Sequence, residues 1–214
     1  MTIIDYMKDH IVFLDGGMGT QLQNRGLAPG EYPERWNVSR REDVIEIQKT
    51  YFDMGSNVIA TNTFGATAFQ FDDAELDAVI RGAVSCAREA QKRSTAPQEK
   101  FVALDVGPLG RLLQPYGDLP FEKAVETYAK AIAIGADAGV DLILIETMKD
   151  SLDTKAALLA AKETCTLPVF VSNAYGEDGK LMTGACPAAM VAMLEGMGAD
   201  AIGVNCSLGP KQLK

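Results

Sequence analysis

The sequence carries little positive charge and no cluster of it. Its 214 residues include 20 Lys and Arg against 29 Asp and Glu, which gives a net charge of −9. No run of Lys and Arg is longer than two residues. Because contacts with phosphates need clustered cations, this balance argues against nonspecific binding to nucleic acid. We therefore expect no nucleic-acid partner.

Long apolar runs are also absent, and cysteine is sparse. No stretch reaches the roughly 18 apolar residues of a membrane-spanning helix. Residues 1–10 lack the apolar centre of a signal peptide. We therefore expect a cytoplasmic protein without membrane contact. The cysteines are not spaced like the disulfide framework of a small secreted domain, which favours reduced thiols; they are Cys86, Cys165, Cys186 and Cys206.

What the sequence does contain is a repeated pattern in which a short apolar run leads into a polar residue. Near-continuous apolar runs of this length are typical of parallel strands that are buried on both faces. The six runs are residues 11–14 before Asp15, 57–60 before Thr61, 101–104 before Asp105, 142–145 before Glu146, 169–171 before Ser172, and 201–204 before Asn205.

Amphipathic stretches fill the gaps between these runs. Ser39 and Glu42 have the spacing of a capping box, which predicts that the first helix begins at Ser39. Pro187 suits the first turn of the last helix. Alternating strands and helices predict an α/β fold with a parallel sheet. The expected helices cover about residues 39–54, 73–93, 121–138, 152–164 and 187–197.

Two α/β architectures fit this alternation. A doubly wound sheet places its ligand at one switch point, whereas a (β/α)8 TIM-type barrel carries polar residues at the carboxyl end of every strand. Polar residues follow all six runs, which favours the barrel. Six strands do not close an eight-stranded barrel. We therefore expect a single barrel domain over residues 1–214 that holds about six βα units and is incomplete at its C-terminal end.

The first candidate site combines a glycine-rich turn with two carboxylates. Residues 15–20 read DGGMGT, and their backbone N–H groups could approach an anion such as a carboxylate closely. An ordinary tight turn is the alternative. Glu146 would need a partner or a solvated cavity at the end of a buried strand. Asp15 and Glu146 together suit an ammonium group, and the combination describes an amino-acid ligand. Residues 62–65 and 105–108 could line a pocket or simply cap strands.

Cys206 is the second candidate. The run GVNCSL at residues 203–208 predicts a buried strand that presents one thiol at its tip. Such a thiol is a zinc ligand, a nucleophile or a small buried apolar residue. One thiol does not make a catalytic zinc site, which takes three protein ligands. Cys186 follows the fifth run, on the face expected for Cys206, and is a weaker candidate ligand.

Together these motifs resemble the homocysteine S-methyltransferase domain, and most of all the N-terminal homocysteine-binding module of cobalamin-dependent methionine synthases. The resemblance covers nearly the whole chain. It rests on DGGMGT at 15–20, TNTF at 61–64, DVGP at 105–108, IET at 145–147 and GVNCS at 203–207.

The resemblance implies a (β/α)8 barrel that transfers a methyl group to homocysteine to give methionine. It implies zinc bound by three cysteines, of which Cys206 matches the first, whereas the sequence contains no match for the other two. It also implies methylcobalamin and methyltetrahydrofolate on separate modules, which would be partners of this chain. The implied substrate-binding residues are Asp15, Gly16, Gly17, Met18, Glu146 and Asn205, and no catalytic side chain is assigned. The alternatives are a related thiol methyltransferase with another methyl donor and a barrel fragment without catalytic activity.

Overall fold

The computed structural model describes residues 1–209 and 211–212. Its centre is a five-stranded parallel sheet with the strands in the order β1-β2-β3-β4-β5. This sequential order confirms the barrel-type arrangement and excludes a doubly wound sheet, in which the strand order reverses at a switch point. The strands are β1 (Val58–Ala60), β2 (Phe101–Val106), β3 (Leu142–Met148), β4 (Val169–Asn173) and β5 (Ala201–Val204).

The prediction of a strand at residues 11–14 is wrong. Only Leu14 forms a bridge, to Val58 of β1, and this segment is not a regular strand of the sheet. Its backbone pairs on one side alone, where the Phe13 carbonyl accepts bonds from the N–H groups of Asn57 and Val58. Because no described strand covers its other side, Ile11 is 79% and Phe13 59% exposed. The segment nevertheless delivers Asp15 to the edge of the sheet.

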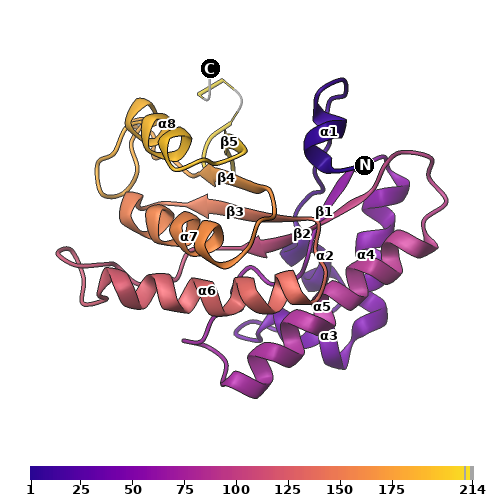
Figure 1. Ribbon diagram of the computed structural model, residues 1–214. Coiled ribbons are helices and arrows are strands. Elements are labelled where there is room, and N and C mark those ends of the chain that lie inside the picture. Colours follow the sequence, from indigo (N-terminus) through magenta and orange to yellow (C-terminus); the bar gives the residue numbers. More distant parts are fainter. Residues whose placement is uncertain (210, 213–214) are drawn as a thin grey trace.

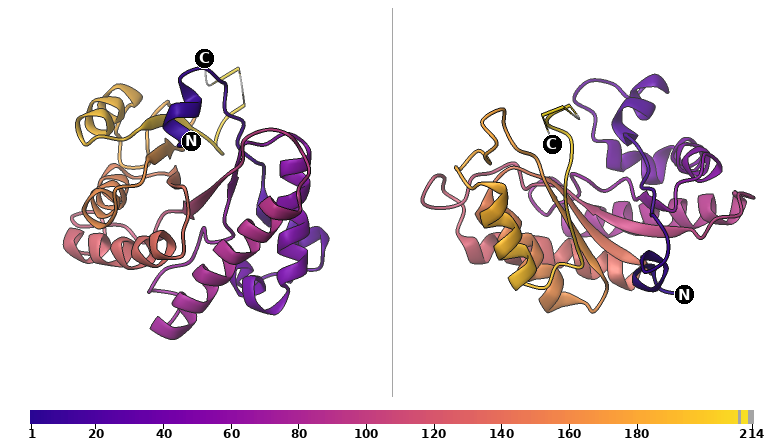
Figure 2. Two further views of the ribbon diagram at one scale, coloured as in Figure 1. Left: turned by 45° about the vertical axis from the view of Figure 1, so that its right-hand side comes forward. Right: turned by 90° about the horizontal axis from the view of Figure 1, so that it is seen from above.

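The long helices lie on the outer face of the curved sheet, as Figures 1 and 2 show. Five of them follow the expected stretches. The helices of this layer are α4 (Arg41–Asp53), α5 (Asp73–Arg93), α6 (Phe121–Asp137), α7 (Ser151–Thr164) and α8 (Pro187–Gly196). The shorter elements are α1 (Ile3–Met7), α2 (Met18–Asn24), η1 (Pro33–Arg35) and α3 (Trp36–Ser39).

Local signals explain most of these boundaries, with one exception. Asp72 caps α5 by accepting bonds from two backbone N–H groups, and Pro187 occupies the first turn of α8 as expected. The expected capping box at Ser39 is wrong. Ser39 ends α3, and its hydroxyl donates to the Arg35 carbonyl, so α4 begins at Arg41 without a side-chain cap. Ser39 does not cap α4 because it belongs to the last turn of α3.

The side chains of the sheet alternate between two hydrophobic layers. Val102, Leu104 and Val106 of β2 pack against the helices, together with Ile143 and Ile145 of β3. The interior layer faces the barrel axis, and α1 packs against it through Ile3 (Figure 2); its buried members are Ile3, Val58, Phe101, Ala103, Leu142, Leu144 and Phe170. This alternation decides which strand-end residues face the interior. Among the described residues, no helix is both long and apolar enough to cross a membrane.

Candidate functional site

Acidic side chains from three segments meet at the carboxyl end of the sheet, on its interior side. Asp15 follows the bridge at Leu14, Asp105 lies in β2 and Glu146 lies in β3. Asp105 continues the interior series of Phe101 and Ala103, because side chains of a strand alternate. Within the described chain, no Lys, Arg or His forms a salt bridge with any of the three. The structure therefore gathers negative charge here without a basic partner.

Asp15 connects the first segment to the sheet. Its Oδ2 atom accepts a hydrogen bond of 2.9 Å from the backbone N–H of Ala60 in β1. Burial, and after it the negative charge of Glu146, raises the pKa of Asp15 to about 7. A carboxyl group whose pKa lies near neutrality gains strongly from a cationic ligand, because the ligand replaces the missing counter-charge.

Glu146 is half-buried and lies within β3, two residues before its end. The sequence placed it at the strand's end, but β3 continues to Met148 through an irregularity in its pairing with β4. Burial raises its pKa. Glu146 lines an open groove of about 230 Å³ along the interior face of the sheet, which is large enough for an amino acid. The groove's other lining residues include Leu14, Leu144, Phe170, Ser172, Ala201 and Asn205.

The glycine-rich turn lies beside Asp15. Gly17 immediately precedes α2, and its carbonyl accepts a bond from the Tyr51 hydroxyl. A Cβ atom at Gly16 would lie 3.1 Å from the Tyr51 ring, so glycine at this position favours the close approach of that ring. Within the described chain, no protein acceptor takes a hydrogen bond from the backbone N–H groups of Gly16, Gly17 or Met18. These three donors are available to a ligand.

Asn205 lies just beyond β5 and connects the ends of three strands. Its Oδ1 atom accepts bonds of 3.0 Å from both the Thr147 N–H and the Ser172 hydroxyl. Its Nδ2 atom donates to the Thr147 hydroxyl at 2.9 Å and to the Cys206 sulfur at 3.5 Å. Thr147 has a φ of 61°, which is strained for a β-branched residue. Asn205 therefore holds the residue next to Glu146 in an unfavourable backbone conformation. Its contact with a substrate stays a prediction.

Cys206 is exposed and has a φ of 55°. It lies at a second open groove, with Lys149, Tyr175 and Met182. Cys186 is also exposed and precedes α8 as its N-cap. In the described part of the chain, no group of three or more His, Cys, Asp or Glu side chains could hold a metal ion. The residues present therefore do not fit a complete zinc site, and Cys206 offers one thiolate alone.

The sequence did not identify two features of this site. Asp105 was one of several strand-end residues without an assigned role, although its interior position follows from the alternation along β2. Glu34 of η1 is 4% exposed and accepts a bond of 2.8 Å from the Gly65 N–H. Burial raises its pKa, and its Oε2 atom has no partner among the described residues. No local pattern in the sequence indicates that this loop glutamate is buried.

Two other polar strand-end residues do not face the interior. Asn62 donates to the Pro33 carbonyl and to Asn37, so it joins the loop after β1 to the preceding helices. Asn173 donates to the hydroxyl of Thr154 in α7. Both residues therefore lie at the carboxyl end of the sheet but outside the interior site. Asn173 follows the outward series of Val169 and Val171, and Asn62 lies in a loop that is already past the strand.

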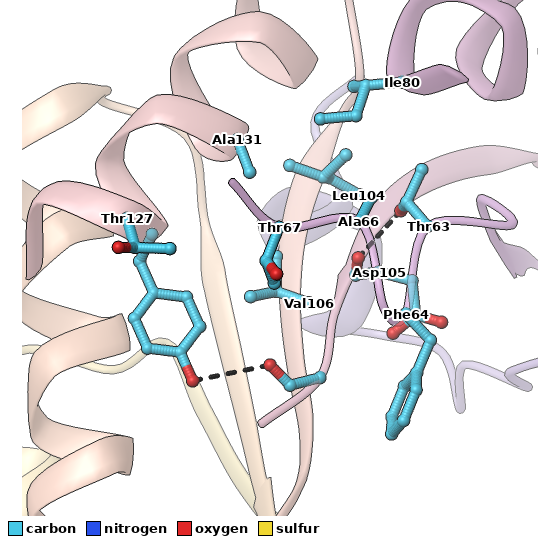
Figure 3. A pocket seen from close by; sticks show the side chains of 12 residues that line it. Thr63, Phe64, Ala66, Thr67, Ile80, Leu104, Asp105, Val106, Thr127 and Ala131 are labelled. Carbon is cyan, nitrogen blue, oxygen red and sulfur yellow. Dashed lines mark hydrogen bonds between the residues drawn. The ribbon is translucent and has the colours of Figure 1, made fainter. Parts of the chain in front are cut away.

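A small cavity lies on the helix side of β2, on the opposite face of the strand from this site. It measures about 10 Å³, enough for about one water molecule, between β2, α5 and α6. Figure 3 shows its lining, with the Thr63 hydroxyl donating to the Asp105 carbonyl at 2.7 Å. Thr61 also accepts a bond of 3.1 Å from the Asp105 N–H. The two threonines therefore fix the backbone of Asp105.

The fold and the site define a class, that of barrel-type α/β proteins with a polar site at the carboxyl ends of their strands. The chain belongs to the homocysteine S-methyltransferase family, whose pattern matches residues 12–214. It is thus a member of a family of methyltransferases, as the five sequence motifs predict.

Individual relatives agree with this membership. The chain is 29% identical over 227 aligned residues to the methionine synthases of Mycobacterium leprae and Mycobacterium tuberculosis. This match covers 99% of the chain but 19% of the length of each relative.

Solved structures show the same fold. The homocysteine methyltransferase MmuM from Escherichia coli, in its metallated form, superimposes with a TM-score of 0.84 at 23% identity. That match covers 98% of this chain and 79% of MmuM. The oxidized form of MmuM gives a TM-score of 0.81 at 24% identity and covers 94% of this chain and 75% of MmuM.

Proposed function

We propose that this chain is the homocysteine-binding part of an enzyme of the methionine synthase type. The observation that carries the proposal is the pairing of Asp15 and Glu146 beside the backbone N–H groups of residues 16–18; among the described residues, the two carboxylates have no basic partner and the three N–H groups have no acceptor. An α-amino acid carries an ammonium and a carboxylate on one carbon. The arrangement offers a counter-charge to the first and hydrogen-bond donors to the second.

In the proposed complex, the ammonium of homocysteine lies between Asp15 and Glu146. Its carboxylate accepts bonds from the N–H groups of Gly16, Gly17 and Met18. The side chain then extends towards Asn205 and Cys206. The reaction forms a bond between the homocysteine sulfur and a methyl carbon, breaks the bond between that carbon and the methyl donor, which leaves with the electron pair, and releases the thiol proton. Because the thiolate is the reactive form of a thiol, the site must favour deprotonation.

The methyl donor and the metal are finer parts of the proposal. Similarity to methionine synthases over 99% of the chain supports methylcobalamin on a separate module, recharged from methyltetrahydrofolate on another. Zinc would activate the thiol, with Cys206 as one ligand. Since the described residues do not complete a zinc site, we derive no step through the metal.

Binding of L-homocysteine to the 214-residue chain tests the proposal. Calorimetric titration under reducing conditions should show binding to the wild type. Glu146→Gln should weaken it roughly 10- to 100-fold, the size expected for loss of a hydrogen bond to a charged group. Glu163→Gln, which changes an exposed glutamate at the end of α7, is the matched control and should leave affinity unchanged. Absence of binding to the wild type, or equal affinities for wild type and Glu146→Gln, would contradict the proposal.

A further inference from the structure

Asp105 is the most buried of the three carboxylates on the interior side of the sheet, and the proposed function leaves it without a role. The residue is 8% exposed. Its Oδ1 atom is buried without a hydrogen-bond partner, and no described residue donates to its carboxylate. A buried carboxylate is costly unless a hydrogen bond or an opposite charge compensates it. Within the described chain, neither is present.

The register of the sheet places Asp105 next to Glu146. Asp105 pairs with Leu144, which lies two residues before Glu146 on the same face of β3. The two acidic residues are therefore offset by one strand, about 5 Å, and by two residues, about 7 Å along the strand. A single ammonium between them can reach both carboxylates. Leu144 itself lines the interior groove, so Asp105 lies beside the floor of that groove.

The electrostatics agree with this placement. After burial, the negative charges of Glu146 and Asp15 are the next largest causes that raise the pKa of Asp105. The negative charge of Glu146 also raises the pKa of Asp15. The three carboxylates thus repel one another across a common space, and a cation in that space would relieve the repulsion.

We propose that Asp105 is the third acceptor for the substrate's α-ammonium and makes the site selective for a primary amine. The inference rests on the proposed function and deepens it. A primary ammonium has three N–H donors, and Asp15, Asp105 and Glu146 supply one acceptor each. An N-methylated amine has one donor fewer and leaves one buried carboxylate unpaired. A deaminated analogue leaves all three without a partner.

The backbone around Asp105 supports this role. Its N–H donates to Thr61 and its carbonyl accepts from Thr63, whose hydroxyls lie 2.7 Å apart. Bonds to its main chain therefore fix the residue, whereas no described residue donates a hydrogen bond to its carboxylate. A side chain that served the fold alone would be expected to use its oxygens in such bonds.

The test compares Asp105→Asn with the wild type in two measurements. Asparagine keeps the size of the side chain and removes the charge. The affinity for L-homocysteine should fall roughly 10- to 100-fold. The affinity for 4-mercaptobutyrate, which lacks the amine, should stay the same or rise. Without ligand, Asp105→Asn should unfold at the same temperature as the wild type or higher, because the substitution removes a buried carboxyl group that has no partner among the described residues.

Asp153→Asn is the matched control. Asp153 is a second buried carboxylate, but it accepts a bond of 2.8 Å from the Tyr128 hydroxyl. Its substitution should lower the unfolding temperature and leave homocysteine affinity unchanged. Equal homocysteine affinity in Asp105→Asn and the wild type would overturn the inference while the proposed function stands. An equal loss of affinity for both ligands, together with a lower unfolding temperature, would show that Asp105 serves the fold. Failure of the wild type to bind homocysteine would instead refute the proposed function.

Discussion

At the scale of single residues, this site depends on side chains that are held in place by neighbours from other strands. Asn205 is the clearest case. Its side-chain amide makes hydrogen bonds with Thr147, Ser172 and Cys206. The bonds hold Thr147 at a positive φ, directly after Glu146. Such strain persists when the surrounding structure compensates for it, and it is common at functional sites.

Asn205→Ala should therefore affect both stability and binding. We expect it to lower the free energy of unfolding by about 1–3 kcal/mol, since it leaves partly buried donors and acceptors without partners. Homocysteine affinity should fall as well, because Thr147 and Glu146 lose their support. Urea unfolding and calorimetric titration measure the two effects. Ser172→Ala removes one of the bonds to Asn205 and should cost less in both. An effect of Ser172→Ala as large as that of Asn205→Ala would contradict the assigned role.

At the scale of elements, close contacts between loops position the carboxyl ends of the strands. The Gly107 N–H, just beyond β2, donates to the Phe64 carbonyl at 3.1 Å. A Cβ atom at Gly107 would lie 2.6 Å from that carbonyl oxygen, well inside contact distance. The loop after β2 can therefore lie against the loop after β1 only with glycine at this position. This contact helps to fix the position of Asp105 along the direction of the strand.

Gly107→Ala should consequently destabilise the protein by about 1–3 kcal/mol, the usual cost of forcing an extra carbon into a packed contact. Gly196→Ala is the matched control, because no atom lies within 4 Å of its Cβ position and the residue belongs to α8. That change should be neutral or stabilise the protein by up to about 1 kcal/mol. Chemical unfolding of both variants measures the difference. The same stability change for both would mean that the loop contact is not tight.

At the scale of the whole molecule, two features stand out. The sheet leaves apolar side chains exposed at both of its edges, among them Ile11, Phe13, Ile202 and Val204. Several buried carboxyl groups also have raised pKa values. Burial is the main cause in each case, and for Asp15 and Asp153 the pKa rises to about 7 and about 6. These groups prefer their protonated forms in the folded state.

The sign of the pH dependence follows from these directions. An unfolded aspartate releases its proton near pH 4, whereas folded Asp15 keeps it until about pH 7. Between these values the folded state binds more protons, so the free energy of unfolding decreases as the pH rises. We expect a higher urea midpoint at pH 5 than at pH 8. Asp15→Asn should reduce the difference, and Glu163→Gln should leave it unchanged. A urea midpoint that rises from pH 5 to pH 8 would contradict the raised pKa values of the buried carboxyl groups.

The sequence by itself determined the alternation of strands and helices and the family. Apolar runs of three or four residues, Asp72 before α5 and Pro187 in α8 are local signals that need no knowledge of distant contacts. The motifs around Asp15, Glu146 and Cys206 are likewise contiguous. Sequential strand order could be predicted because polar residues followed every run, which is typical of a barrel.

Only the tertiary structure decided which polar residues share the site. Asn173 and Asp105 both lie near the ends of strands, but their positions in the alternation point the first at α7 and the second at the interior. Residues 11–14 pair on one side alone and therefore lie outside the regular sheet. Ser39 ends the short α3 and therefore does not cap α4 as expected. Register, burial and the charges of neighbouring strands arise when segments far apart in the sequence pack together. No local pattern in the sequence predicts this register, this burial or these neighbouring charges.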